Sequence, residues 1–164
     1  MPVGRRIEMI QSAEKSEILD LVYRYAWLID EKQFDEWLDL FTDDASYVVT
    51  TQENARAGLE FGPIMERKDT LRERIGEYKK LWWVDPAVTS HIVSNPLIEV
   101  TDSTHAEVKC YITLYRSEEH HVTELQGCAK CWLALEKREG EWKIRSFKAV
   151  FDADIIPGVL DIPV

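Results

Sequence analysis

A histidine and an aspartate are the residues of this sequence best suited to acid–base chemistry. His91 follows Pro86 and lies in a run rich in β-branched residues, 88–100, so we expect it near the start of a strand. Asp30 ends a stretch of helical periodicity, where the helix dipole disfavours a negative charge. A carboxylate bonded to one imidazole nitrogen fixes the tautomer in which the other nitrogen removes a proton. The pair therefore predicts a general-base dyad.

Each member of this pair also has an ordinary structural interpretation. A strand histidine can be half-buried and bonded to a neighbouring carbonyl group, and an aspartate between two helices can cap the second helix at an exposed corner. The sequence leaves both interpretations open. Four tyrosines are candidate phenol donors beside the dyad: Tyr23, Tyr25, Tyr47 and Tyr111.

Two further motifs carry weaker signals. His120 and His121 are neighbours in a predicted strand, so their side chains diverge and one of them can face inward to reach a substrate. Cys128 and Cys131 match the C-x-x-C spacing, but residues three apart in a strand face opposite sides of the sheet. The common nucleotide, zinc-protease and acyl-enzyme motifs are missing. We therefore expect no metal and no cofactor.

Three amphipathic helices are expected to position these groups. Apolar residues keep helical spacing over 12–30, with Ser12 as the N-cap, over 34–41, and from residue 69 or 70 to about residue 81. The stretch 53–62 has no clear period and contains two glycines, which predicts a loop over the mouth of a cavity.

Strands dominate the rest of the predicted chain. After a turn at 42–44, alternating or β-branched patterns predict strands over the segments 45–51, 92–100, 106–116, 120–135 and 142–151. In the third of these, Tyr111, Thr113 and Tyr115 share one face, which we expect to line a wet cavity. The aliphatic, proline-containing tail 155–164 is expected to be a lid or a partner contact.

Composition limits the function classes. The 164 residues fit a single domain, 1–164, and the net charge of −10 disfavours nucleic acid and anionic membranes as partners. No apolar run is long enough to span a membrane, and three cysteines without a framework spacing suit reduced thiols, so we expect a cytoplasmic protein. Plentiful Trp and Tyr suggest an aromatic-lined pocket, for which the expected substrate-binding residues are Trp27, Trp83, Tyr111 and Asn95.

The order of the predicted elements resembles the SnoaL-like superfamily, which has the cone-shaped fold of nuclear transport factor 2. Segments 23–37, 71–75 and 85–95 are similar to the small (beta) subunit of Rieske-type aromatic-ring-hydroxylating dioxygenases, and this likeness covers nearly the whole chain. The resemblance implies an α+β fold, in which three helices of the N-terminal half wrap a curved, antiparallel-rich sheet around an internal cavity. It also implies a structural trimer beneath Rieske oxygenase alpha subunits, with no metal of its own.

A second resemblance concerns the dyad. Asp30 and His91 match the catalytic aspartate and histidine of scytalone dehydratase and hexachlorocyclohexane dehydrochlorinase. That likeness implies a second histidine, His120 or His121, and tyrosines that polarise a carbonyl group through water, such as Tyr25 and Tyr47. Dioxygenase beta subunits carry a comparable aspartate and histidine, so the pair alone does not separate the two branches.

The leading expectation from the sequence is a cofactor-independent lyase, dehydratase or isomerase. It would act on a small aromatic or alicyclic compound, with His91 taking the substrate proton and Asp30 orienting the ring. The alternative is a non-catalytic beta subunit of a Rieske-type dioxygenase. In either case we expect a homotrimer formed through the outer face of the sheet.

Overall fold

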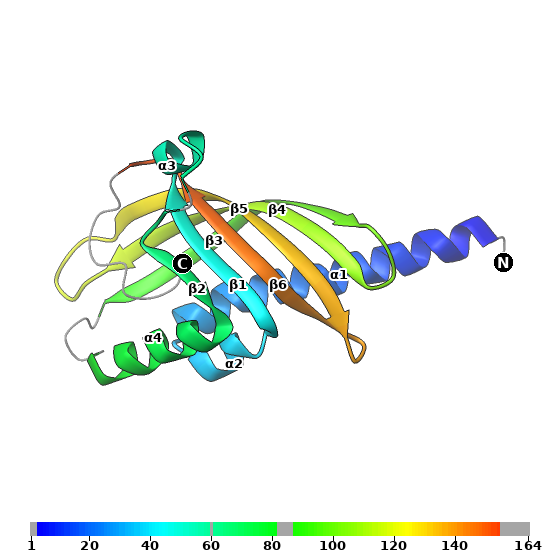
Figure 1. Cartoon of the computed structure of the whole chain (residues 1–164), viewed down its shortest axis with the longest axis horizontal. Helices are drawn as coiled ribbons and strands as arrows, with labels where there is room; N and C mark the ends of the chain where they lie inside the picture. The colour runs from blue at the N-terminus through cyan, green and yellow to red at the C-terminus, as the bar shows by residue number, and fades with distance from the viewer. Residues whose placement is uncertain (1–2, 60, 82–86, 155–164) are drawn as a thin grey trace.

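The computed structural model describes residues 3–59, 61–81 and 87–154, which form four helices and one six-stranded sheet (Figure 1). The helices of the described residues all lie in the N-terminal half of the chain: α1 (Val3–Asp30), α2 (Phe34–Leu38), α3 (Gln52–Arg56) and α4 (Lys68–Leu81). The strands are β1 (Phe41–Thr51), β2 (Ile64–Arg67), β3 (Val88–Val100), β4 (His105–Ser117), β5 (Glu124–Arg138) and β6 (Glu141–Phe151). The predicted α+β class is confirmed.

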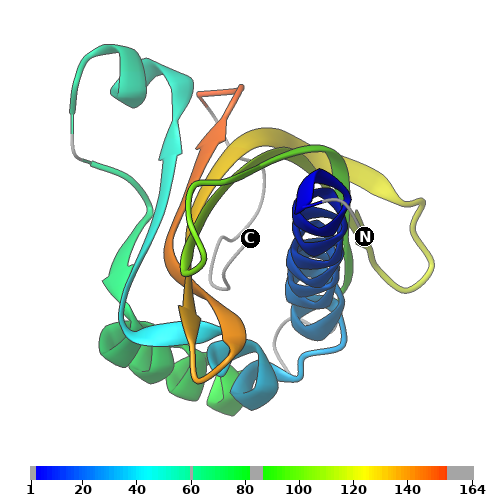
Figure 2. The same ribbon diagram turned by 90° about the vertical axis from the view of Figure 1, so that its right-hand side faces the viewer.

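The sheet has the strand order β2-β1-β6-β5-β4-β3. All neighbouring strands are antiparallel except β1 and β6, which pair in parallel. The sheet is therefore mixed but antiparallel-rich, with β3 at one edge. Figure 2 shows that it curls around α1, so this helix lies along the concave inner face.

Helix α1 presents an apolar stripe to this concave face. Ile18, Val22, Tyr25 and Ile29 are all buried, and their spacing of three or four residues places them on one side of the helix. They belong to one hydrophobic core with the inner residues of the strands, and Tyr25 stacks on Phe147 of β6. The amphipathic pattern predicted for this helix is confirmed.

Strand β4 shows which residues of the sheet face the helix. Its inner face is apolar and buried, and consists of Ala106, Val108, Cys110, Ile112 and Leu114. Tyr111 and Tyr115 lie on the opposite, outer face and are 40% and 36% exposed. The prediction that this tyrosine face lines an internal cavity is wrong. A strand face with polar and aromatic side chains can contact solvent, a partner protein or a cavity. The alternation of residues therefore does not show whether that face points inward or outward.

Strand β1 begins at Phe41, so the turn predicted at 42–44 is wrong. The register with β6 shifts after Phe41, and Asp43 and Asp44 point to solvent at this irregularity. The Lys68 ammonium group donates to the Phe41 carbonyl at 2.9 Å and to the Asp43 carboxylate at 3.1 Å. Adjacent acidic residues favour a turn in sequence, whereas a β-bulge accommodates them within a strand.

Other boundaries also differ from the predicted ones. Helix α1 starts at Val3 rather than at Ser12. The predicted loop 53–62 contains most of α3, a five-residue helix that is too short to show a period; its N-cap Thr51 accepts a hydrogen bond from the Asn54 N–H. No described helix has the length and apolar character needed to cross a bilayer.

Candidate active site

Asp30 and His91 meet where the end of α1 packs against the start of β3. The His91 Nδ1 atom lies 2.5 Å from Asp30 Oδ1, and the His91 backbone N–H donates to Oδ2 at 2.8 Å. The Thr89 hydroxyl donates to Oδ1 at 3.1 Å. Thr89 and His91 are two residues apart in a strand, so both side chains face inward. The predicted contact of the dyad is present, and its use in catalysis stays a prediction.

The three donors explain how a carboxylate is tolerated at the C-terminal end of a helix. The helix dipole disfavours a negative charge there, and hydrogen bonds from a neighbouring strand offset that cost. A further contact joins the residues that flank these two elements: the Lys32 ammonium group, just after α1, donates to the Ala87 carbonyl, just before β3, at 3.1 Å. The carboxyl end of α1 is thus joined to the start of the edge strand by this contact as well as by the dyad.

Only one nitrogen of the buried His91 ring, Nδ1, is held by the Asp30 carboxylate. The His91 side chain is 1% exposed, whereas that of Asp30 is 20% exposed. The carboxylate only accepts hydrogen bonds, which assigns the proton to Nδ1 and makes Nε2 of the neutral ring an acceptor. Nε2 is buried and has no hydrogen-bond partner among the described residues. This arrangement is chemically suited to remove a proton from a bound molecule.

Tyr25 and Tyr47 lie deep in the core and bond to one another. Their hydroxyl oxygens are 2.8 Å apart, and each residue is only 1% exposed. Both rings stack on Phe147, with centroid distances of 4.9 and 4.8 Å. Burial, followed by the neighbouring Tyr47, raises the pKa of Tyr25 well above its ordinary value. The two phenols are hydrogen-bonded to one another, and their role toward a substrate stays a prediction.

His120 and His121 lie in the turn between β4 and β5, and both are exposed. The His120 side chain is 88% exposed, and its Nε2 atom lies 3.4 Å from the Glu119 carboxylate. The prediction that one of these histidines faces inward from a strand is wrong. The polar stretch before Glu124 forms a longer turn than predicted, so it carries both histidines into solvent.

The residues expected to bind a substrate are scattered over the surface. Trp27 on α1 is 67% exposed, and Tyr111 lies on the outer face of β4. Asn95 is exposed and has a positive φ of 52° at an irregularity of β3. The structure therefore does not gather these three side chains around the dyad. Trp83 and the tail 155–164 lie outside the described residues.

Comparison with known proteins identifies the family. The family model for the SnoaL-like domain matches residues 11–148. The chain belongs to the SnoaL-like family. Among sequence relatives, it is 24% identical over 140 residues to subunit beta 2 of the terminal oxygenase component of terephthalate 1,2-dioxygenase from Comamonas sp., covering 85% of this chain and 91% of that protein. It is 30% identical over 114 residues to the small oxygenase component of the p-cumate 2,3-dioxygenase system of Pseudomonas putida, covering 62% and 60%.

Solved structures show the same SnoaL-like fold. A proposed beta subunit of an aromatic-ring-hydroxylating dioxygenase from Novosphingobium aromaticivorans superposes with a TM-score of 0.84 at 18% identity, covering 94% of this chain and 99% of that one. The beta subunit of benzoate 1,2-dioxygenase from Burkholderia mallei has a TM-score of 0.74 at 21% identity, covering 88% and 95%. The resemblance to dioxygenase beta subunits thus extends over nearly the whole chain.

Two features of this SnoaL-like chain escaped the sequence analysis. Thr89 supplies the third donor to the Asp30 carboxylate. The only sign of it in the sequence is its place two residues before His91 on a predicted strand. Cys131 is paired in register with Cys110 of β4, and the Cys110 thiol, followed by burial, raises the pKa of Cys131. Cys128 instead lies beside the Thr113 hydroxyl. Among the described residues no cluster of three or more metal-binding side chains occurs.

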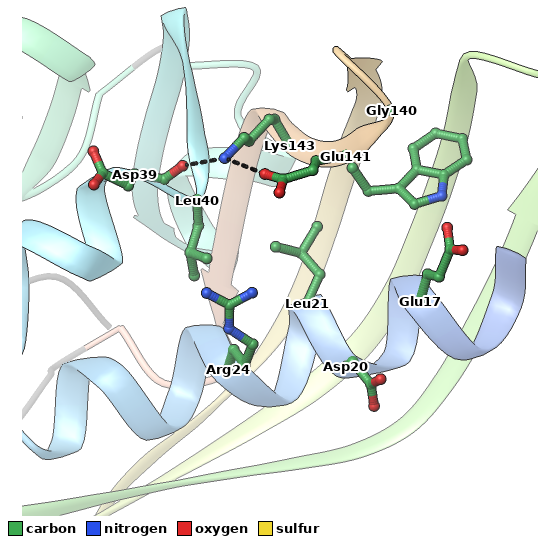
Figure 3. A pocket seen from close by; sticks show the side chains of 10 residues that line it. Glu17, Asp20, Leu21, Arg24, Asp39, Leu40, Gly140, Glu141 and Lys143 are labelled. Atoms are coloured by element: carbon green, nitrogen blue, oxygen red, sulfur yellow. Dashed lines mark hydrogen bonds and ion pairs between the residues drawn. The ribbon is translucent and has the colours of Figure 1, made fainter.

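A separate hollow of about 330 Å³ lies away from the dyad, between α1, the segment that joins α2 to β1, and the start of β6. Figure 3 shows Leu21 and Arg24 of α1 pointing toward Leu40 and Lys143 across it. The Lys143 ammonium group donates to the Asp39 carbonyl at 2.9 Å. Neither member of the dyad lines this hollow, so it is not a substrate cavity for that chemistry.

Proposed function

We propose that this chain is a non-catalytic beta subunit of an aromatic-ring-hydroxylating dioxygenase, which assembles with a catalytic alpha subunit. The observation that supports this best is its similarity, over most of both chains, to subunit beta 2 of the terminal oxygenase component of terephthalate 1,2-dioxygenase. The superposition on two further beta subunits is consistent with it. In this function the chain is a scaffold, and the iron centres belong to the partner.

The outer face of the sheet supplies a surface for this assembly. Large apolar side chains project from three adjacent strands, β3, β4 and β5, and are 36–61% exposed: Val88, Ile92, Tyr111, Tyr115 and Trp132. Contiguous exposed apolar side chains commonly mark protein interfaces, and aromatic residues are enriched at such sites. We propose that copies of the chain form a homotrimer through this face.

Co-purification from the native host tests the assembly. A tagged copy of the chain is expected to bring down a larger protein whose visible spectrum and iron content show a Rieske cluster and a mononuclear iron. Ring hydroxylation by the isolated alpha subunit should then be weak or absent and should be restored by adding the chain. A chain that remains a stable homotrimer, with no iron-containing partner and no effect on hydroxylation, contradicts the proposal.

A second candidate function is favoured by the dyad itself. The Nε2 atom of His91 is buried, lacks a partner among the described residues, and belongs to a ring oriented by a carboxylate. We propose as the alternative a cofactor-independent lyase or isomerase that acts on a small aromatic or alicyclic molecule. His91 takes a proton from a substrate carbon, Asp30 stabilises the imidazolium that forms, and the electron pair of the C–H bond expels a leaving group or shifts a double bond.

A histidine variant tests this alternative. With a panel of halogenated and hydroxylated cyclohexanes and tetralones, measured by halide release and by product absorbance, His91→Ala should lower kcat by about 10²–10⁴-fold. His105→Ala is a matched control, because His105 is exposed at the first residue of β4. Equal turnover by His91→Ala and the wild type would contradict a general-base role.

A further inference from the structure

We propose that Thr89 is a positioning residue of the dyad. Its hydroxyl holds the Asp30 carboxylate in the orientation that keeps the proton on Nδ1 of His91 and leaves Nε2 as the acceptor. The chemical use of this arrangement rests on the lyase alternative described above. The arrangement itself does not need turnover, so the two are open to separate tests.

The donor set of Asp30 gives Thr89 a specific place. Oδ2 accepts the backbone N–H of His91, while Oδ1 accepts both His91 Nδ1–H and the Thr89 hydroxyl. An ionised carboxylate has about four lone-pair sites, so Thr89 fills the second site on the oxygen that orients the imidazole. The Asp30 side chain is 20% exposed, and without this hydroxyl water would compete for Oδ1.

The position of Thr89 makes its hydroxyl a rigid donor. Thr89 is 8% exposed, and its backbone pairs with Arg116 of β4, so the strand fixes its Cα. Threonine is β-branched, which restricts χ1 and keeps the hydroxyl aimed at the carboxylate. The contact between Lys32 and Ala87 anchors the same end of β3 to the end of α1. The three donors therefore come from one strand at a fixed distance from the helix.

This arrangement restricts the chemistry of a bound molecule. A neutral imidazole with its proton on Nδ1 presents a lone pair at Nε2, and a lone pair binds a donor. The matching ligand group is a hydroxyl, an N–H, or a C–H made acidic by a neighbouring carbonyl group or halogen. A carboxylate or carbonyl oxygen is disfavoured at the same point, because two acceptors repel one another.

Nitrogen NMR of the full chain tests the proposal directly. In protein labelled with ¹⁵N-histidine at pH 8, long-range correlations of the ring protons should show Nδ1 protonated and Nε2 unprotonated for His91, which is assigned by its loss in His91→Gln. Thr89→Val removes the hydroxyl and keeps the shape of the side chain. It should move both nitrogen shifts toward the average of the two tautomers, whereas Thr89→Ser should keep the wild-type shifts.

A matched variant and a second readout complete this experiment. Thr42→Val changes a buried threonine of β1 and should leave the His91 shifts unchanged. The proposal is overturned if Thr89→Val shows the same His91 nitrogen shifts as the wild type. It is also overturned if the wild-type spectrum shows the proton on Nε2, and this second test does not depend on a variant that folds. If a substrate is found, Thr89→Val should lower kcat more than it changes KM. Shifts as predicted without any turnover would refute the lyase function and support the positioning role.

Discussion

At the scale of single residues, Asp30 carries a negative charge at the C-terminal end of a helix, where the helix dipole disfavours it, and the fold offsets this cost with hydrogen bonds. It is the last residue of α1, and its oxygens accept three hydrogen bonds from β3. Those donors would be left buried and unpaired if the carboxylate were removed. The same contacts that orient His91 therefore also join helix to strand, and this structural contribution does not depend on catalysis.

Replacing Asp30 with alanine should lower the free energy of unfolding by about 2–3 kcal/mol, because it leaves buried donors without an acceptor. Urea denaturation followed by tryptophan fluorescence measures the change. Asp20→Ala on the exposed face of the same helix is the control and should stay within about 0.5 kcal/mol of the wild type. Equal stability of the two variants would show that the dyad contributes nothing to the fold.

The buried phenol of Tyr25 predicts a loss of stability at alkaline pH. Its pKa is raised in the fold by burial and then by Tyr47, so above pH 10 the unfolded chain releases a proton that the folded chain retains. The free energy of unfolding should therefore fall as pH rises past 10. Tyr25→Phe should cost about 1 kcal/mol at pH 8 and show a shallower decline between pH 9 and 11. Tyr23→Phe, which alters an exposed ring, should keep the wild-type slope.

The sequence was informative about the dyad and less so about its surroundings. Asp30 and His91 were found because a helix end and a strand start are visible in periodicity, and both are local features. Tyr111 was predicted to face inward and faces outward, because the side of the sheet against which α1 packs decides which strand face is buried. His120 was misplaced because the length of a turn depends on the pairing of β4 with β5. Both depend on contacts between segments that are distant in sequence.

At the scale of elements, the long α1 and the β3–β6 meander were predictable because their apolar patterns are repeated over many residues. Short elements were not. Helix α3 and strand β2 contain five and four residues, too few for a period, and depend on contacts with β1. The parallel pairing of β1 with β6 is likewise invisible in sequence, since nothing local distinguishes it from an antiparallel neighbour.

The segment that precedes β2 packs closely against β1 at Gly62, and this close contact can be tested by substitution. A Cβ atom on Gly62 would lie 2.0 Å from the Val49 carbonyl oxygen, so Gly62→Ala forces two backbones apart. We expect a loss of about 1–3 kcal/mol in the free energy of unfolding. Gly76→Ala is the paired control: nothing lies within 4 Å of its Cβ position in α4, and the change should stabilise by about 0.5–1 kcal/mol. A neutral Gly62→Ala would contradict the close approach.

At the scale of the whole molecule, the two faces of the sheet differ in what they contact. The concave face holds the core and the dyad, whereas the convex face of β3–β5 exposes apolar side chains that the monomer does not need for folding. An acidic chain with such a face gains from covering it, since charge keeps the remaining surface soluble. The proposed trimer and the proposed alpha-subunit partner both depend on surfaces of this kind, independently of the dyad.

Ile92→Asp tests the convex face as the trimer interface. Ile92 is 51% exposed on β3 opposite Thr113, so a charge there should not disturb the core but should be costly in a desolvated interface. By light scattering after size exclusion, the wild type should have three times the chain mass of 19.1 kDa, and Ile92→Asp should shift to the monomer mass. Val122→Asp changes an equally apolar residue, 77% exposed in the β4–β5 turn, and should remain trimeric. A trimeric Ile92→Asp would place the interface elsewhere, and a monomeric wild type would leave the convex face to the alpha subunit alone.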